Sequence, residues 1–277
     1  MNLKRLLTGI IGFPIVLVVL VFANKYIIDI VIAIVAAISM YEYSKCAKNK
    51  EIKVVSWLGY LLCVLIATVH LIPASLVPII LTIACPLIIF ILFLHVICTD
   101  MKITFKDISI SLIGYLYVGF LLFFVLMYGT KSFPWNLSGK QAVWYILFAA
   151  WMTDIAAYTV GKRIGKHKFS KVSPNKTIEG CIGGVIWAAV SGTIFTICLN
   201  KFGGTQVPYT FAFAVLAFLS VIGQIGDFSA SVIKRYFDVK DYSNLFPGHG
   251  GMIDRIDSVI FIAPFAYAIF VIASLIV

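Results

Sequence analysis

The sequence contains very few charged residues. Asp, Glu, Lys and Arg make up 12% of the 277 residues, whereas 61% are hydrophobic. Soluble globular domains carry about a quarter charged residues, so this scarcity excludes an ordinary water-soluble domain. Residues 54–99 contain no Lys, Arg, Asp or Glu at all. We therefore expect the bilayer to be the main solvent of the chain.

Several motifs of soluble proteins are also missing. The six cysteines form no C-x-x-C pair, and most lie inside apolar runs, which indicates small packing residues. The segment 161–166 (GKRIGK) has three residues between its glycines where a phosphate-binding P-loop has four, and it lacks Ser or Thr after the lysine. No dinucleotide or nucleic-acid motif is found, so no nucleic-acid partner is expected.

Long apolar runs stand in place of these features. About twenty such residues can cross a hydrocarbon core roughly 30 Å thick as a helix, and the runs lack the alternation of a membrane barrel. The sequence predicts an all-α polytopic membrane protein, with N-terminal spans in 1–130 and, in 131–277, further spans joined by polar loops 162–180 and 227–255. About nine spans are expected: 7–23, 27–43, 54–72, 76–98, 108–129, 142–161, 181–198, 209–226 and 256–277.

The basic residues are distributed unevenly between the loops. With the N-terminus placed in the cytoplasm, eighteen of the 22 Lys and Arg residues fall in cytoplasmic segments. The positive-inside rule therefore predicts an integral protein of the cell (inner) membrane with a cytoplasmic N-terminus. The net charge of +10 then lies beside anionic lipid head groups and cytosolic anions. Both long polar loops also fall on this side, which predicts an active site at the cytoplasmic face.

The polar residues after the eighth span have a suggestive spacing. If the helix continues past the membrane surface, Asp227, Ser231 and Lys234 fall at i, i+4 and i+7, on one face. The glycine-rich segment 247–251 (PGHGG) follows, and its backbone can approach a phosphate closely. Asp254 comes just before the ninth span, so a hairpin would bring two carboxylates towards each other.

This segment resembles the signature of the phosphatidate cytidylyltransferase family. The pattern runs S-x-x-K-R, four residues, K-D, a short spacer, H-G-G and D-R-x-D, and every fixed position is present from Ser231 to Asp257. The segment 173–180 (SPNKTIEG) is similar to the family's S-P-x-K-T-x-E-G element, and 154–161 resembles its intramembrane Asp segment. The N-terminal half matches only as a set of hydrophobic spans.

The resemblance implies a reaction and its cofactors. The cytidylyl group of CTP would pass to phosphatidic acid, giving CDP-diacylglycerol and pyrophosphate for phospholipid biosynthesis. A phosphate monoester has a second pKa near 6, so the nucleophile is already mostly dianionic and needs no general base. The obstacle is the meeting of two polyanions, which calls for Mg²⁺ held by carboxylates together with Lys and Arg. The family also implies a monovalent cation such as K⁺, and a homodimer within the membrane lipid.

The candidate site residues follow from the motifs. Asp227 and Asp254 are the expected metal ligands. Asp154 is the next candidate, because an acidic residue inside a span costs about 2.5 to 3.5 kcal/mol and tends to line an interior cavity; whether it contacts metal stays open. The expected catalytic residues are Asp227, Lys234, Arg235, His249, Asp254 and Arg255. The expected substrate-binding residues are Ser173, Lys176, Thr177, Glu179, Ser231, Lys240, Asp241, Gly250, Gly251 and Asp257, of which Glu179 and Asp257 would orient the cations.

Three other functions are alternatives to a phosphatidate cytidylyltransferase. A CDP-alcohol phosphatidyltransferase needs the pattern D-G-x-x-A-R…G-x-x-x-D-x-x-x-D, which is absent. A relative acting on archaeal-type isoprenoid phosphatidate stays open, although the chain length and nine spans argue mildly against it. A secondary transporter usually has two related halves with broken helices, and no such repeat is visible.

The expected topology can be tested at the C-terminus. Nine spans and a cytoplasmic N-terminus place Val277 outside the cytoplasm. A reporter enzyme that is active only in the cytoplasm should therefore be silent when fused after this residue. Strong reporter activity would mean an even number of spans.

Overall fold

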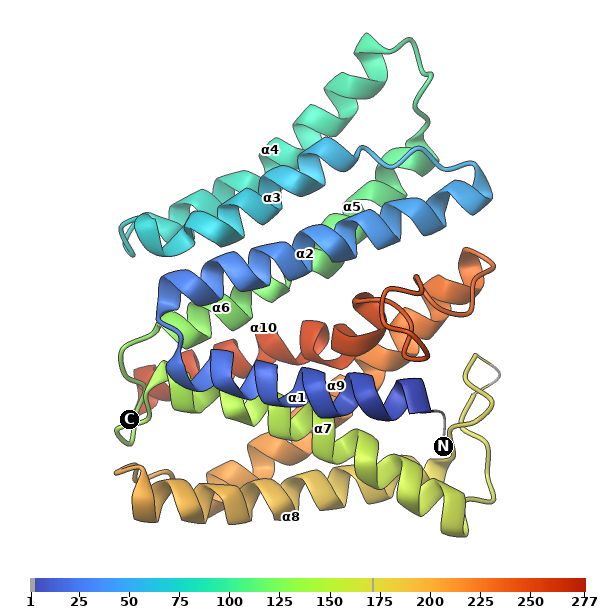
Figure 1. Cartoon of the computed structure of the whole chain (residues 1–277). Coiled ribbons are helices and arrows are strands. Elements are labelled where there is room, and N and C mark those ends of the chain that lie inside the picture. The colour runs from blue at the N-terminus through green and yellow to red at the C-terminus, as the bar shows by residue number, and fades with distance from the viewer. Residues whose placement is uncertain (1–2, 171) are drawn as a thin grey trace. The chain divides into compact units, whose positions relative to one another are not determined.

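The computed structural model describes residues 3–170 and 172–277, with side chains from residue 12 onward. Helices dominate this part of the chain, and outside them only isolated β-bridges occur in the described loops, so the predicted all-α architecture is confirmed. Figure 1 shows the helices in chain order. They are α1 (Leu3–Phe22), α2 (Lys25–Ala47), η1 (Lys48–Lys50), α3 (Ser56–Thr68), η2 (Val69–Leu71), α4 (Val77–Cys98), α5 (Phe105–Gly119), α6 (Leu121–Gly129), α7 (Gly139–Ile164), α8 (Ile178–Phe202), α9 (Tyr209–Tyr236) and α10 (Ile253–Ile276).

The number of membrane spans differs from the expected nine. Among the described residues, seven helices are long and apolar enough to cross a membrane. The predicted third span corresponds to the shorter apolar helix Ser56–Leu71, which covers about 24 Å, less than the roughly 30 Å of a hydrocarbon core. The predicted first span lies in the 20-residue helix α1, whose side chains are described only from Gly12 onward. The count of nine is therefore not confirmed and stays a prediction.

The chain divides into two compact units. Unit 1 comprises Met1–Val125 and Tyr236–Arg255, and unit 2 comprises Leu126–Arg235 and Ile256–Val277. The chain enters unit 1 twice, because the polar segment between α9 and α10 belongs with the N-terminal helices. Whether the chain is also organised as the predicted parts 1–130 and 131–277 stays a prediction.

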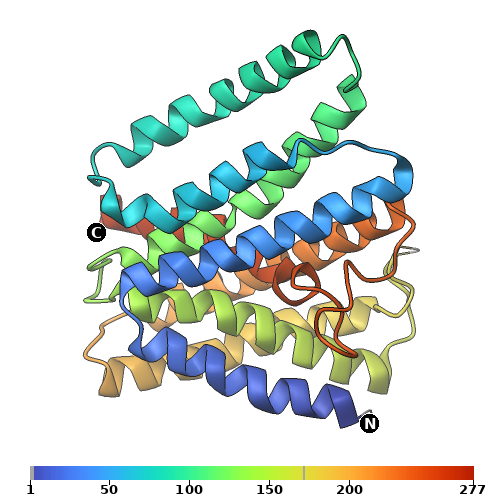
Figure 2. The same cartoon turned by 45° about the horizontal axis from the view of Figure 1, so that its top comes forward.

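In unit 1, α2, α3 and α5 lie side by side in both views (Figures 1 and 2). A glycine on α5 makes a close approach possible, since a Cβ at Gly114 would lie 2.5 Å from the Tyr43 ring of α2. The Tyr43 hydroxyl donates to the Ile110 carbonyl at 2.9 Å. Thr104 is the N-cap of α5 and forms a capping box with Asp107. The Asp107 carboxylate also accepts from the Lys53 amide at 2.7 Å. These contacts hold the C-terminal end of α2, which is predicted to face the cytoplasm. The polar segment 236–252 contacts this end of the helix.

In unit 2, α8 packs through a row of small residues. Gly184, Ala188, Gly192 and Thr196 recur every four positions and are all buried. A Cβ at Gly184 would lie 3.1 Å from Thr153 of α7, and one at Gly192 would lie 2.3 Å from Leu216 of α9. Small residues at this spacing let helix backbones approach closely in membranes. The row therefore brings α7 and α9 against α8.

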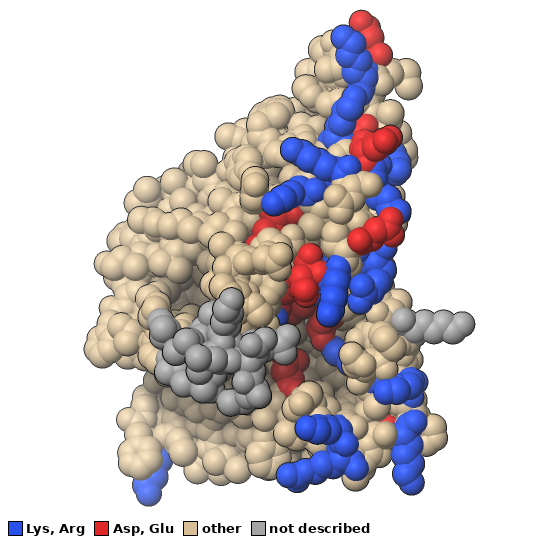
Figure 3. All heavy atoms as spheres, turned by 45° about the vertical axis from the view of Figure 1, so that its right-hand side comes forward, with Lys and Arg blue, Asp and Glu red and all other residues tan. Residues whose placement is uncertain are grey.

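The outward faces of the helices are apolar. Most of the surface in Figure 3 is tan, with the charged side chains occupying a small part of it. On α8, Ile186 and Ile194 are 58% and 56% exposed, opposite the row of small residues. Exposed apolar faces of this extent are expected where lipid rather than water surrounds a helix.

The row of small residues generates a stability prediction. Gly192→Leu should drive a side chain into Leu216, and overpacking of this kind costs about 1 to 3 kcal/mol. The thermal midpoint of the detergent-solubilised protein should fall by several degrees. Cys198→Leu is the matched control, because residue 198 lies on the same helix and is exposed. Equal midpoints for the two variants would contradict this packing.

Candidate functional site

A closed loop connects α7 to α8 and presents Lys176. The Phe169 amide donates to the Lys176 carbonyl at 3.1 Å, and the Ile178 amide donates to the His167 carbonyl at 2.9 Å. At the end of this loop, the Thr177 hydroxyl caps α8 by accepting from the Gly180 amide at 3.2 Å. Lys176 is thereby held two residues before the start of α8.

Three of the predicted substrate-binding residues, Glu179, Thr177 and Ser173, stabilise this loop. Glu179 accepts from the Lys166 and His167 amides at 3.2 Å, and its carboxylate pairs with His167 Nδ1 at 2.6 Å. Thr177 is 6% exposed, and a Cβ at Gly165 would lie 2.6 Å from its hydroxyl. Ser173 closes the tip of the loop, where its carbonyl accepts from the Lys176 amide at 3.1 Å. Contact of these side chains with substrate stays a prediction.

The Lys176 ammonium lies among three carboxylates. It forms an ion pair with Asp227 of α9, and both side chains are 25% exposed. Burial lowers the pKa of Lys176, because the charged form loses hydration, while the charges of Asp154 and Asp257 oppose this shift. Helices α7, α9 and α10 thus each carry one carboxylate near enough to act on the charge of the Lys176 ammonium. Residues from three parts of the sequence meet here.

This carboxylate set has the chemistry of a divalent-cation site. Carboxylate oxygens are the ligands that Mg²⁺ prefers, usually one or two of them completed by substrate phosphates. Within 3–170 and 172–277, no group of three or more His, Cys, Asp or Glu could hold a metal ion by itself. The donor type therefore fits Mg²⁺ provided that substrate oxygens complete the shell. In the structure, Lys176 supplies the compensating charge.

The predicted polar face of α9 is present. The helix runs without interruption from Tyr209 to Tyr236, so Asp227, Ser231 and Lys234 lie on one face. Lys234 adds to the lowering of the Lys176 pKa, because a nearby like charge disfavours the charged form. Arg235, in the last turn, is exposed.

In unit 1, a residue that the sequence analysis missed holds the second polar segment. Glu42 of α2 is 2% exposed, and its carboxylate accepts from the Ser243 hydroxyl at 2.6 Å. It also accepts from the amides of Met252 and Ile253 at 2.9 and 3.0 Å, where α10 begins. A carboxylate at these amides stabilises the start of a helix. The sequence signal was an acidic residue inside the apolar run 27–43.

Asp254 connects the same two ends of the segment. Its Oδ2 accepts from the amides of Tyr242 and Gly251, each at 2.9 Å, and the residue is 9% exposed. One oxygen of this predicted metal ligand is therefore engaged by the backbone. Asp254 belongs to unit 1 and Asp227 to unit 2, and their joint metal site stays a prediction.

Further contacts anchor the segment 236–252 to α2 and η1. Phe237 is buried with its ring edge-on to Tyr43, the centroids 5.5 Å apart. Asn49 donates to the Phe237 carbonyl at 3.3 Å, and the Cys46 thiol donates to the Tyr242 carbonyl at 3.3 Å. The N-terminal helices therefore position the family signature, although they carry none of its residues.

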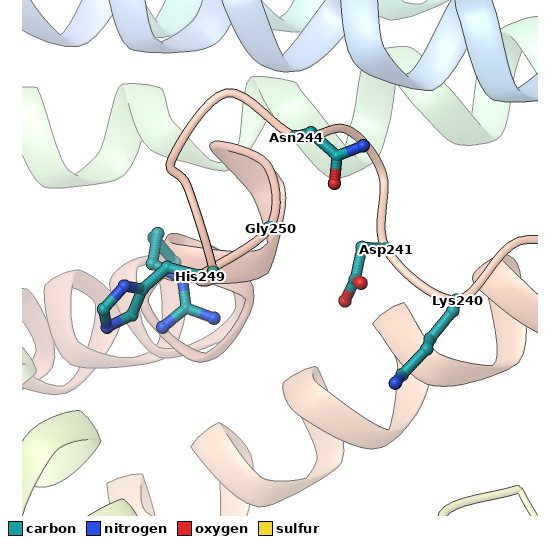
Figure 4. Close-up of a pocket in the computed structure, with 7 residues that line it drawn as sticks. Lys240, Asp241, Asn244, His249 and Gly250 are labelled. Carbon is teal, nitrogen blue, oxygen red and sulfur yellow. The ribbon is translucent and has the colours of Figure 1, made fainter. Parts of the chain in front are cut away.

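The segment encloses a pocket of about 360 Å³ (Figure 4). Figure 4 shows Asp241 and Asn244 pointing into the space within the loop. Gly248 and Gly250 have φ of 80° and 85°, which side-chain-bearing residues rarely adopt, so the turn requires glycine at both positions. Lys240, His249 and Arg255 outnumber the one carboxylate of the lining, that of Asp241, so the pocket suits an anion. The lining consists of Lys240, Asp241, Asn244, Gly248, His249, Gly250 and Arg255.

The role assigned to Glu42 can be measured. Glu42→Ala removes three hydrogen bonds and leaves buried amides unsatisfied, at about 1 to 3 kcal/mol each. Amide hydrogen exchange at residues 251–253 should accelerate, and the segment 236–252 should become more sensitive to protease. Ser243→Ala removes only one of the three bonds and should have a smaller effect. Exchange in Glu42→Ala that matches the wild-type protein would contradict the anchoring role.

Comparison with known proteins identifies the family. Residues 3–273 match the model of the cytidylyltransferase family. A phosphatidate cytidylyltransferase of Bacillus subtilis (strain 168) is 32% identical over 276 residues, covering 95% of this chain and 96% of the relative. The protein of the same name from Staphylococcus haemolyticus (strain JCSC1435) is 37% identical over 176 residues, covering 63% of this chain and 64% of the relative. With its signature residues held on α9, on α10 and on the polar segments of an all-helical chain, this protein belongs to the cytidylyltransferase family.

Proposed function

We propose that this membrane protein transfers the cytidylyl group of CTP to phosphatidic acid, forming CDP-diacylglycerol and pyrophosphate. The observation that carries this proposal is the Lys176 ammonium, partly buried among carboxylates of three helices. A site that brings two phosphate-bearing substrates together needs cationic groups. When the substrates are absent, other groups of the protein must balance the charges of these cations. The resemblance to proteins named phosphatidate cytidylyltransferase, over nearly the whole chain, supports the same reaction.

The chemistry requires charge neutralisation more than proton transfer. An oxygen of the phosphatidate dianion forms a bond to the α-phosphorus of CTP, and the bond from that phosphorus to the bridging oxygen of the β-phosphate breaks. The leaving pyrophosphate takes the electron pair. Because the nucleophile is already ionised near neutral pH, the side chains act by positioning and by electrostatic stabilisation.

We assign the cation site to the carboxylates around Lys176. Asp227, with Asp154 or Asp257, would hold Mg²⁺ together with substrate oxygens, and Asp254 stays a candidate ligand. When bound, the metal supplies positive charge that shields the phosphates of both substrates. Lys176 then turns from Asp227 to a phosphate oxygen of the nucleotide, while Lys234 and Ser231 contact the phosphates from the same face of α9. A monovalent cation such as K⁺ beside the metal is part of the proposal.

The pocket in the segment 236–255 is proposed to hold a phosphate group of a substrate. Lys240, His249 and Arg255 supply positive charge or N–H donors around it. This arrangement would receive CTP from the cytosol at the cytoplasmic face of the inner membrane. A homodimer is the expected assembly.

Release of pyrophosphate by the purified protein tests the function itself. Detergent-solubilised wild-type protein should release pyrophosphate only when CTP and phosphatidic acid are both present. Activity with an isoprenoid ether phosphatidate but not with a diacyl substrate would favour the archaeal-type alternative. The absence of any CTP-dependent release would reopen the transporter interpretation.

The cation site is tested by Asp227→Asn. Asparagine keeps the shape and an oxygen acceptor but loses the charge that balances Lys176 and binds a hard cation. We expect kcat to fall about 100-fold or more, as when one preorganised electrostatic contact is removed, with a partial recovery at high magnesium.

The matched control is Asp238→Asn. It makes the same change in the ion pair of Asp238 with Lys50, where the aspartate side chain is 68% exposed. This variant should keep its activity. A wild-type kcat and an unchanged magnesium requirement in Asp227→Asn would remove Asp227 from the metal site.

A further inference from the structure

Unit 2 contains a second hollow, of about 430 Å³, that the proposed chemistry does not use. It lies between α8, α9 and the loop that carries Lys176. Its walls include Ile182 and Val185 of α8 and Val221 and Val232 of α9. Ile182, Val221 and Val232 are 56%, 43% and 52% exposed, so apolar groups face an open space. The volume lies in the range of about 300 to 1,000 Å³ that is usual for small-molecule sites.

The polar residues of this hollow are turned towards the protein backbone. Gln224 donates to the Cys181 carbonyl at 3.2 Å, and the Ser229 hydroxyl donates to the Ile225 carbonyl at 2.8 Å. The Ser170 hydroxyl oxygen accepts from the Val172 amide at 3.2 Å. A base or sugar would need polar groups directed at it, whereas an alkyl chain needs none. The lining therefore suits a hydrocarbon chain.

One end of the hollow adjoins the proposed phosphate site. Phe169 and Phe228 line the hollow and stack with their ring centroids 4.6 Å apart. The Lys176 ammonium lies 4.5 Å from the centroid of the Phe228 ring, and its partner Asp227 is the preceding residue. An apolar groove thus begins beside a cation that is proposed to bind phosphate. The matching ligand is an amphiphile with a phosphate head and an alkyl chain.

We propose that this groove binds one acyl chain of the phosphatidate substrate. The proposal rests on the proposed function and adds the place where the lipid chain lies. The phosphate sits near Lys176, the aromatic pair contacts the glycerol end of the chain, and the chain runs between α8 and α9. The chain reaches the groove from the bilayer rather than from water, so selectivity depends on packing contacts. A long chain that fills the groove makes more of these contacts than a short one.

Narrowing the groove tests this proposal. Val185→Trp should raise KM for a dioleoyl phosphatidate by tenfold or more, because the larger side chain would occupy space that the long acyl chain needs. KM for CTP and turnover of a dioctanoyl phosphatidate should change little. Ile186→Trp is the matched control, because residue 186 is the next on α8, is 58% exposed and does not line the groove. It should leave both KM values unchanged.

Three results would overturn the acyl-chain site while leaving the reaction intact. They are an equal effect on short- and long-chain substrates, a change in KM for CTP alone, and the same effect in Ile186→Trp. Failure of the wild-type protein to release pyrophosphate would instead overturn the proposed function.

Photo-crosslinking of the wild-type protein keeps the test independent of how well Val185→Trp folds. A phosphatidate with a diazirine in its acyl chain should label peptides of α8 and α9. Excess phosphatidic acid should suppress this labelling, and excess phosphatidylcholine should not. Suppression by both lipids would mean a site for any bilayer lipid and would contradict the proposal.

Discussion

Glu42 carries a carboxylate into the interior of unit 1, where only 2% of the residue is exposed. A buried charge is costly unless hydrogen bonds satisfy it. Its three donors come from Ser243, Met252 and Ile253, so the polar segment must return to α2. The pocket of basic residues exists because this contact and the Asp254 contacts hold the two ends of one short stretch.

The same constraint operates in unit 2 with the opposite sign. Lys176 places a positive charge beside the helices, and the carboxylates of Asp227, Asp154 and Asp257 stabilise it. In the proposed function these groups exchange partners: a divalent cation binds the carboxylates, and a substrate phosphate binds the ammonium. A site of balanced charges beside an apolar groove suits a substrate that is itself half phosphate and half hydrocarbon.

The N-terminal helices gain a function from this arrangement. They contain none of the signature residues, yet α2 and η1 contact the segment 236–252 through Tyr43, Cys46 and Asn49. Substitutions in α2 are therefore expected to act on the signature through its backbone. The family match extends over residues 3–273 and so includes these N-terminal helices.

The sequence by itself determined the features that depend on composition and short spacing. Scarce charge and long apolar runs indicated the all-α membrane class, and the i, i+4, i+7 spacing placed Asp227, Ser231 and Lys234 on one helix face. Tertiary structure alone decided which charges meet. Met252 and Glu42 are 210 positions apart, and no local periodicity connects them. Such pairs form because helix packing buries charges that must then find partners, and packing depends on the whole set of apolar faces and close-approach glycines.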